Sequence, residues 1–117
     1  MISVVIRTKN EEKWIGRCLS AVAAQNYPTF EVILVDNEST DSTLDIVSGY
    51  DCKLVRISDQ EFSFGRSLNW GIQAAAGEFV AIVSGHCIPV NDRWLLNMRA
   101  AFSGESIAGV YGRQLPL

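Results

Sequence analysis

Three short polar groups in the sequence each follow an apolar run, and their residue types suit the binding of a nucleotide and its phosphates. A carboxylate such as Asp36 can accept a hydrogen bond from the N–H of a uracil or thymine ring, and backbone groups near Thr8 can contact another edge of the base. An arginine such as Arg66 can neutralise a diphosphate through paired N–H contacts. The groups are Arg7–Asn10, Asp36–Asp41 and Ser84–Cys87.

The elements that must position these groups follow from the hydrophobic pattern. Continuous apolar segments predict buried strands over residues 2–6, 30–35, 53–57, 78–83 and 107–111. Amphipathic spacing predicts helices over residues 11–23, 41–47, 66–76 and 92–102. Apolar strands that alternate with helices indicate an α/β fold with a mostly parallel sheet of four to five strands, flanked by helices. We expect residues 1–117 to form a single domain.

Residues at the predicted helix ends carry expectations of their own. Asn10 is expected to cap the first helix, with Glu11 and Glu12 complementing the helix dipole in its first turn. The other predicted caps are Ser39 or Thr40 for the second helix, a left-handed Gly77 that ends the third, and Asn91 or Asp92 for the fourth.

The three polar groups are expected to meet at one edge of the sheet, because ligands of open parallel sheets bind beyond the carboxyl ends of the strands. We interpret Asp36 as a ligand-binding carboxylate and Asp41 mainly as a helix cap. Phe62 and Phe64 either line an acceptor groove or cover the sheet edge, and we expect the second. Arg66 is either a ligand contact or a solvated surface residue.

Composition limits the classes of protein to which the chain can belong. Hydrophobic residues make up 48% of the sequence and charged residues 20%, which is typical of a globular protein. The net charge of −3, without a basic run, predicts no nucleic-acid partner. The three cysteines form no CxxC pair, so neither a zinc site nor a disulfide framework is expected. With no signal peptide or membrane-spanning run, we expect a cytoplasmic protein, located at the inner face of the membrane in its full-length form.

The turn after the first strand excludes several nucleotide-binding classes. It reads RTKNEE and contains no glycine, whereas a dinucleotide-binding fold would place the pattern GxGxxG there. The Walker A phosphate-binding loop is also missing, and sugar-nucleotide pyrophosphorylases likewise use a glycine-rich turn at this place.

Two long stretches carry a resemblance to a known family. SVVIRTKNEEKWIGRCLSAVAAQNYPTFEVILVDNESTDST resembles the opening of the family 2 inverting glycosyltransferases with the GT-A fold. LNWGIQAAAGEFVAIVS is similar to the second block of that family, and the closing AGVYGRQLP resembles its rhamnosyltransferase-like branch. Complete GT-A domains are substantially longer, so the resemblance implies an N-terminal, donor-binding fragment.

The resemblance implies a role for individual residues. Thr8 would lie in the base pocket, Asp36 would match the base-binding aspartate, and Asp41 would shape the turn that follows. The nucleotide-sugar site it implies comprises Thr8, Asn10, Glu11, Asp36, Arg66, Ser84, Gly85 and His86.

The sequence departs from the family pattern at three places. Ser84 and His86 occupy the two acidic positions of the Asp-x-Asp motif, whose carboxylates hold a divalent cation, Mn²⁺ or Mg²⁺. His86 could be a single ligand to Mn²⁺, which imidazole suits better than Mg²⁺, or could contact the diphosphate directly, or the site could lack a metal. Leu68 stands where the family commonly has Arg or Lys, which makes Arg66 the nearest substitute. Arg7 stands where the family often has proline.

The resemblance implies a sugar transfer from UDP or dTDP to a saccharide or lipid-linked acceptor hydroxyl with inversion, in cell-envelope polysaccharide synthesis. The general base of that reaction is expected beyond Leu117. One alternative is a domain that binds a nucleotide sugar without catalysis. Another is an assembly module, including a homo-oligomer, that pairs through the edge of its sheet.

Overall fold

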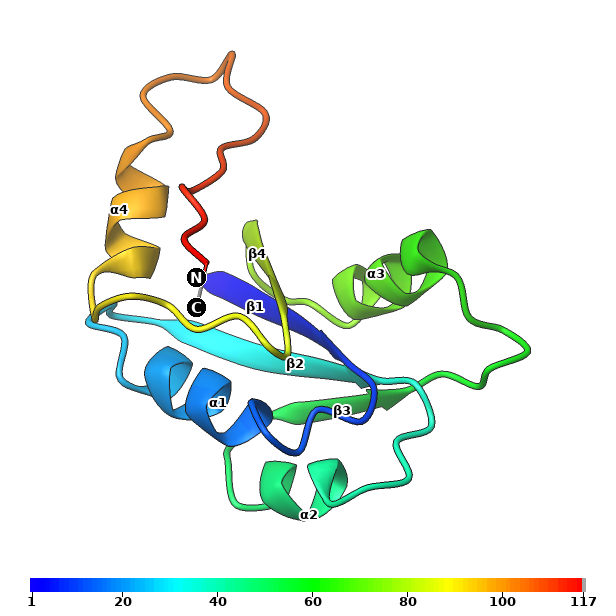
Figure 1. Cartoon of the computed structure of the whole chain (residues 1–117). Coiled ribbons are helices and arrows are strands. Elements are labelled where there is room, and N and C mark those ends of the chain that lie inside the picture. Colours follow the sequence, from blue (N-terminus) through cyan, green and yellow to red (C-terminus); the bar gives the residue numbers. More distant parts are fainter. Residues whose placement is uncertain (117) are drawn as a thin grey trace.

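The computed structural model, which describes residues 1–116, contains one parallel sheet of four strands in the order β3-β2-β1-β4 (Figure 1). The strands are β1 (Ile2–Thr8), β2 (Phe30–Asp36), β3 (Lys53–Arg56) and β4 (Phe79–Ser84). All three pairings are parallel, and β1 lies between β2 and β4. The predicted α/β fold is therefore confirmed. The fifth strand is wrong, because residues 107–111 form no strand.

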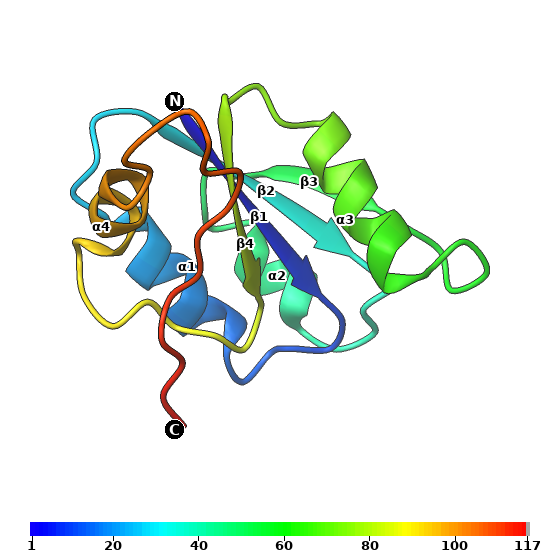
Figure 2. The same cartoon turned by 90° about the horizontal axis from the view of Figure 1, so that it is seen from above.

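Four helices cover the two faces of this sheet (Figure 2). They are α1 (Ile15–Ala23), α2 (Thr43–Val47), α3 (Phe64–Gln73) and α4 (Trp94–Ala100). Helix α3 lies on one side of the sheet, and α1 and α4 lie on the other. The result is a sheet buried on both faces, which is why its central strands are apolar without interruption.

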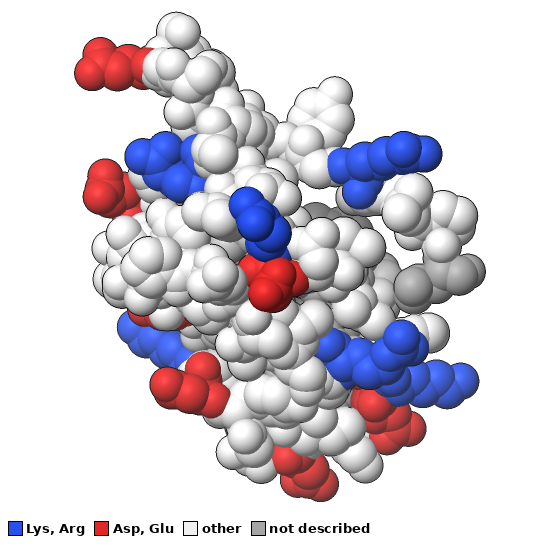
Figure 3. Space-filling model, turned by 90° about the vertical axis from the view of Figure 1, so that its left-hand side faces the viewer, with Lys and Arg blue, Asp and Glu red and all other residues white. Residues whose placement is uncertain are grey.

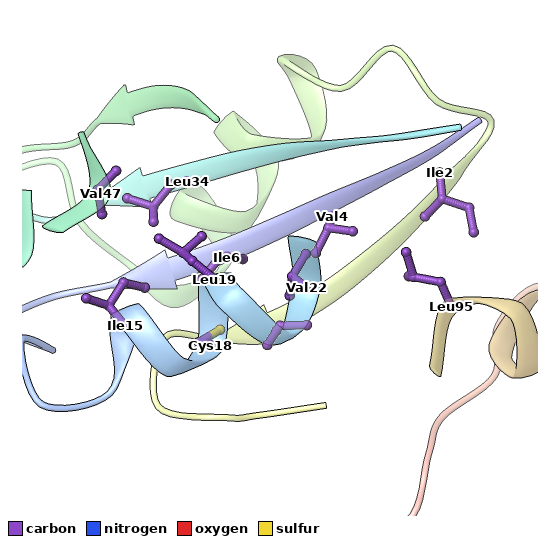
Figure 4. Close-up of a cluster of buried hydrophobic side chains, with 11 residues drawn as sticks. Ile2, Val4, Ile6, Ile15, Cys18, Leu19, Val22, Leu34, Val47 and Leu95 are labelled. Atoms are coloured by element: carbon purple, nitrogen blue, oxygen red, sulfur yellow. The ribbon is translucent and has the colours of Figure 1, made fainter. Parts of the chain in front are cut away.

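The core is divided between the two faces by the alternation of side chains along each strand. On the face of α1, α2 and α4, Val4 and Ile6 of β1 pack against Ile15 and other buried residues of α1 (Figure 4). On the opposite face, Val5 packs with Ile33 and Val35 beneath α3. Neighbouring residues of β1 thus anchor different layers.

Helix α3 approaches the sheet closely at Gly71. A Cβ at this position would lie 2.5 Å from Cγ1 of Val5 and 3.0 Å from Cγ2 of Val35. Both valines are buried. Only a residue without a side chain lets the helix pack at this distance.

The predicted cap of the first helix is wrong. The residue at the N-cap of α1 is Trp14, so Glu11 and Glu12 precede the helix instead of forming its first turn. Asn10 has φ of 51° and turns its side chain to another segment, where Oδ1 accepts from the backbone N–H of Thr40 at 2.7 Å. Asn10 therefore makes a tertiary contact instead of the helix cap that the local sequence pattern predicts.

The caps predicted at Ser39 or Thr40, at Gly77, and at Asn91 or Asp92 are wrong as well. Ser42 precedes α2, Arg93 precedes α4, and Ser63 caps α3 by accepting from the backbone N–H of Arg66 at 3.0 Å. Helix α3 ends at Gln73, and Gly77 does not adopt a left-handed conformation. Gly77 is required for a different reason, because a Cβ there would lie 2.7 Å from the backbone oxygen of Met1.

The face seen in Figure 3 carries acidic and basic side chains interspersed with uncharged ones, and no broad patch of one sign. No helix among residues 1–116 combines the length and the apolar composition that a membrane crossing would need.

Candidate functional site

A pocket of about 380 Å³ lies at the carboxyl ends of β1, β2 and β4. Its walls come from these strand ends, from the segment that follows β3 and from the start of α3. The lining residues are Arg7, Thr8, Lys9, Glu11, Val35, Asn37, Asp59, Phe62, Phe64, Ser84 and His86. Another hollow, of about 390 Å³, lies near the start of β2 and β3, at the opposite end of the strands. The topology of a parallel sheet favours the carboxyl-end pocket as the ligand site.

The pocket brings together four of the eight residues predicted from the sequence: Thr8, Glu11, Ser84 and His86. Glu11 and His86, which lie 75 positions apart, form a direct contact of 2.9 Å between Oε1 and Nδ1. This contact joins the loop after β1 to the turn after β4. The side chain of His86 remains 57% exposed, so the imidazole is accessible to a ligand.

Gly85 does not line the pocket, but it determines how the β4 turn sits against β1. Its backbone N–H donates to the carbonyl of Arg7 at 2.9 Å. A Cβ on Gly85 would lie 3.0 Å from Oγ1 of Thr8. That hydroxyl is buried and has no hydrogen-bond partner among the described residues.

Asp36 is fully buried and does not line the pocket. Both of its oxygens accept from Ser39, at 2.5 Å from Oγ and 3.0 Å from the backbone N–H. Strand β2 includes Asp36, so the side chain of this residue points to the opposite face from that of Val35. The carboxylate therefore builds the turn after the strand.

Asn37, the next residue, faces the pocket instead. Its backbone N–H donates to the carbonyl of Thr8 at 3.0 Å. In the orientation that satisfies its neighbours, the amide nitrogen lies 3.0 Å from Oδ1 of Asp59 and 3.3 Å from the carbonyl of Ile57. The sequence prediction included Asn37 only within the polar group Asp36–Asp41 and not among the eight site residues, although its place directly after the strand was the available signal.

A network of hydrogen bonds joins the loop after β1 to the turn after β2. The backbone N–H groups of Asn10, Glu11 and Glu12 donate to side chains of the turn, and side chains of the loop accept from the turn in return. The bonds run from Asn10 N to Ser39 Oγ (2.9 Å), Glu11 N to Thr43 Oγ1 (2.9 Å), Glu12 N to Asp41 Oδ2 (3.2 Å), Thr40 N to Asn10 Oδ1 (2.7 Å), Asp41 N to Asn10 Oδ1 (3.3 Å), Thr40 Oγ1 to Asn10 Oδ1 (3.5 Å) and Ser42 N to Glu12 Oε2 (3.0 Å). Asn10 thus supports the wall of the pocket and does not line it.

Asp41 belongs to this network. Desolvation acts against its charge, but hydrogen bonds from Thr43 and from the N–H of Glu12 hold the pKa of Asp41 below its ordinary value. The carboxylate accepts from Thr43 through both Oγ1, at 2.5 Å, and the backbone N–H, at 2.9 Å. As predicted for a helix cap, Asp41 accepts from a backbone N–H at the start of α2, and it lies outside the pocket.

Arg66 does not line the pocket either. Its Nη1 donates to the carbonyl of Glu61 at 2.7 Å, which ties the guanidinium to the loop before α3. Arg7 supplies the arginine of the pocket. Its guanidinium carbon lies 5.0 Å from the ring centroid of Phe64.

Two charged pairs frame the pocket. Lys9 Nζ contacts Oδ1 of Asp59 at 2.7 Å, and both side chains are about half exposed. The hydrogen bond from Lys9 is the main reason why the pKa of Asp59 lies below its ordinary value. The second pair is Glu11 with His86.

The 2.9 Å contact between Glu11 Oε1 and His86 Nδ1 has the length of a hydrogen bond, and it places a carboxylate beside an imidazole at the pocket. A carboxylate with an imidazole suits Mn²⁺ better than Mg²⁺. Within residues 1–116, no three His, Cys, Asp or Glu side chains gather to hold a metal ion. A cation at this place would take its other ligands from the bound molecule and water.

Comparison with known proteins places the fold. The chain superposes on the mannosyltransferase PcManGT from Pyrobaculum calidifontis, solved with GDP-Man and Mn²⁺, with a TM-score of 0.80 and 26% identity over 91% of this chain and 33% of that one. It superposes on S. aureus TarS 1-349 in complex with UDP-GlcNAc with a TM-score of 0.72 and 32% identity, over 99% and 37% of the two chains. The sheet and its helices therefore form a GT-A type α/β fold.

The chain belongs to glycosyl transferase family 2, because the sequence model of this family matches residues 3–115. Glycosyltransferase AglE of Haloferax volcanii is 34% identical over 117 residues, which cover 95% of this chain and 38% of AglE. The chain thus spans well under half the length of this relative.

Proposed function

We propose that this chain forms the donor-nucleotide site of a glycosyltransferase that transfers a sugar from a nucleoside-diphosphate sugar to an acceptor hydroxyl with inversion. The observation that carries the proposal is the pocket at the carboxyl ends of the strands. The pocket combines hydrogen-bonding groups at the end of β2 with a carboxylate–imidazole pair that joins the loop after β1 to the turn after β4. Family 2 membership supports it, as do the GDP-Man and UDP-GlcNAc of the two similar structures.

The base of the nucleotide would lie beside Asn37 and Thr8. With its amide nitrogen directed to Asp59, the side chain of Asn37 presents its oxygen as an acceptor. An acceptor here favours a base with a ring N–H, such as uracil or thymine, over cytosine or adenine. The buried, unpartnered hydroxyl of Thr8 offers a further polar contact. Asp36 would act indirectly, by fixing the turn from which Asn37 projects.

The diphosphate would lie toward β4, beside Ser84 and His86. Glu11 and His86 would hold a divalent cation there, with Mn²⁺ the best fit. When bound, such a cation neutralises the charge that develops on the leaving diphosphate. The general base that accepts the acceptor proton would come from a part of the protein beyond Leu117.

The resemblance to cell-envelope polysaccharide enzymes and to the rhamnosyltransferase-like branch suggests a saccharide or lipid-linked acceptor at the cytoplasmic side of the membrane. A second candidate function is nucleotide-sugar binding without transfer. This candidate is favoured by Ser84 and His86, because these two residues stand at the positions where the resembling family has the two aspartates of its Asp-x-Asp motif.

Calorimetric titration tests the proposal. UDP, dTDP, GDP and ADP are titrated into the protein, first with EDTA and then with Mn²⁺. We expect UDP or dTDP to bind more tightly than ADP, and Mn²⁺ to strengthen the binding. In His86→Ala and Glu11→Gln the gain from Mn²⁺ should be lost, whereas binding in EDTA should persist. If none of the four nucleotides binds under either condition, the proposal is refuted.

A further inference from the structure

Arg7 has a charge that the site described so far does not use. It lies near the carboxyl end of β1, in register with Val35 of β2 and Ser84 of β4. Strand β1 lies between these two strands (Figure 2). Because Val5 faces α3, Arg7 two residues later faces α3 as well. Its side chain therefore enters the pocket between the end at Asn37 and the end at His86.

The other charges of the pocket are already paired. Lys9 contacts Asp59, and His86 contacts Glu11. Arg7 has no ion pair with any residue in the range 1–116. Its neighbour across the β1–β4 pairing is Ser84, a neutral residue, so no carboxylate from that strand competes for the guanidinium.

The environment of Arg7 leaves hydrogen-bonding groups free for a ligand. Its Nε is buried and has no hydrogen-bond partner among the described residues, which is unfavourable unless another molecule supplies one. Phe64 lies 5.0 Å from the guanidinium carbon, within the range of about 6 Å in which a ring attracts a cation. Such a contact is made through the ring face and leaves the N–H edges able to bind an anion in the guanidinium plane.

Phe64 is itself held in place on the pocket wall. Its ring packs edge-on against Phe62, with centroids 5.3 Å apart and an interplanar angle of 71°. Ser63, between them, caps α3. Phe64 is nevertheless 70% exposed, so its contact with Arg7 is not part of the core. The aromatic pair therefore holds the Arg7 guanidinium beside the pocket.

We propose that Arg7 binds the diphosphate of the nucleotide directly, through its guanidinium N–H groups, and does so whether or not a divalent cation is present. This inference rests on the proposed function, which places a nucleoside diphosphate in the pocket. Arg7 lies between the two parts of that ligand, and a diphosphate is the part that carries negative charge. Bidentate contact with phosphate oxygens is the interaction for which a guanidinium is best shaped.

The test compares three ligands that differ only in phosphate. Uridine, UMP and UDP are titrated by calorimetry in EDTA, and again in Mn²⁺, into the wild-type protein, Arg7→Gln and Arg7→Lys. The matched control is Arg17→Gln, which removes the same charge and the same type of aromatic contact outside the pocket, since Arg17 lies 5.3 Å from the ring of Trp14. Thymidine, dTMP and dTDP replace the series if dTDP proves the better ligand.

We expect Arg7→Gln to weaken UDP binding about ten- to a hundredfold, the range for hydrogen bonds to a charged group. Uridine binding should change less than about twofold, the loss should be present in EDTA, and Arg17→Gln should behave as wild type. Arg7→Lys keeps the positive charge but loses the paired N–H groups of the guanidinium, so its affinity for UDP should lie between those of Arg7→Gln and the wild-type protein. If Arg7→Gln does not fold, the titration of Arg7→Lys decides, with UDP weakened and uridine unchanged.

Two outcomes would overturn the inference. One is an unchanged affinity of the Arg7 variants for UDP, and the other is an equal loss for uridine and UDP, which would mean that Arg7 only shapes the pocket. Failure of the wild-type protein to bind any nucleotide would instead refute the proposed function, so the two failures are distinguishable.

Discussion

Replacing Gly71 by alanine should force α3 away from the sheet. The added Cβ would lie 2.5 Å from Cγ1 of Val5, whereas carbon atoms in contact are about 3.5–4.0 Å apart, so a displacement of about 1 Å is needed. Val5 is fully buried and β-branched, and a second contact, with Val35, closes the other side. The neighbouring side chains therefore have little freedom to yield.

The expected loss of stability combines two opposing effects. Overpacking of a buried site costs about 1–3 kcal/mol. Alanine in place of a mid-helix glycine returns about 0.5–1 kcal/mol. The net destabilisation should be about 1–2 kcal/mol, which for a chain of this size lowers the melting temperature by roughly 3–10 °C.

Urea unfolding followed by circular dichroism measures this difference, with Gly65→Ala as the matched control. Gly65 lies in the first turn of the same helix, and a Cβ there would have no atom within 4 Å. The control should be neutral or more stable, by up to about 1 kcal/mol. If Gly71→Ala proves as stable as Gly65→Ala, the close approach of α3 to the sheet is not a constraint, and the reasoning is refuted.

Three further predictions concern other parts of the fold. Ser39→Ala removes the hydroxyl that donates to the buried Asp36 carboxylate and accepts from the backbone N–H of Asn10, and it should cost about 1–3 kcal/mol in urea unfolding; a loss below measurement would mean that water replaces the hydroxyl. The hydrogen bond from Ser3 is the main cause of the lowered pKa of Glu31. The ionised Glu31 carboxylate therefore stabilises the fold above its ordinary pKa, and this stabilisation is lost as the pH falls through the folded-state pKa. In Glu31→Gln the free energy of unfolding should fall less steeply with decreasing pH, and an unchanged pH dependence would contradict this. Burial, with a smaller effect of Cys87, raises the pKa of the Cys18 thiol to about 12, so at pH 8 this thiol should react with a disulfide reagent only as the protein unfolds.

The sheet could be predicted from the sequence because both faces of each central strand are buried. Continuous apolar runs such as Val32–Val35 leave no alternative to a covered strand, and the alternation with helices then determines the parallel order. The predicted strand over residues 107–111 shows the limit of this reasoning. A short apolar segment becomes a strand only if a neighbouring strand is available to pair with it. The sequence of the segment itself does not show whether such a neighbour exists.

The site could be predicted only in part, because the side on which a residue projects depends on where its strand ends. Strand β2 extends one residue further than the apolar run, so Asp36 points away from the pocket and Asn37 faces it. Asp59 and Phe64 reach the pocket through a segment without periodicity, and no pattern in the sequence predicts its path. Asn10 shows the same limitation, since its partner Thr40 lies 30 positions away.

The hydrogen bonds between the loop after β1 and the turn after β2 have a consequence for how the protein can change. Seven hydrogen bonds that involve a side chain tie these two segments together, whereas among residues 1–116 the turn after β4 reaches them through one side-chain contact, that of His86 with Glu11. Substitutions in the loop after β1 or the turn after β2 should be tolerated only when a residue of the other segment changes in compensation. The residues of these two segments should therefore vary together among related proteins. Apart from Gly85, which packs closely on β1, the β4 turn can vary with less disturbance, and it is the natural place to exchange residues when a related protein is redesigned for another metal or donor.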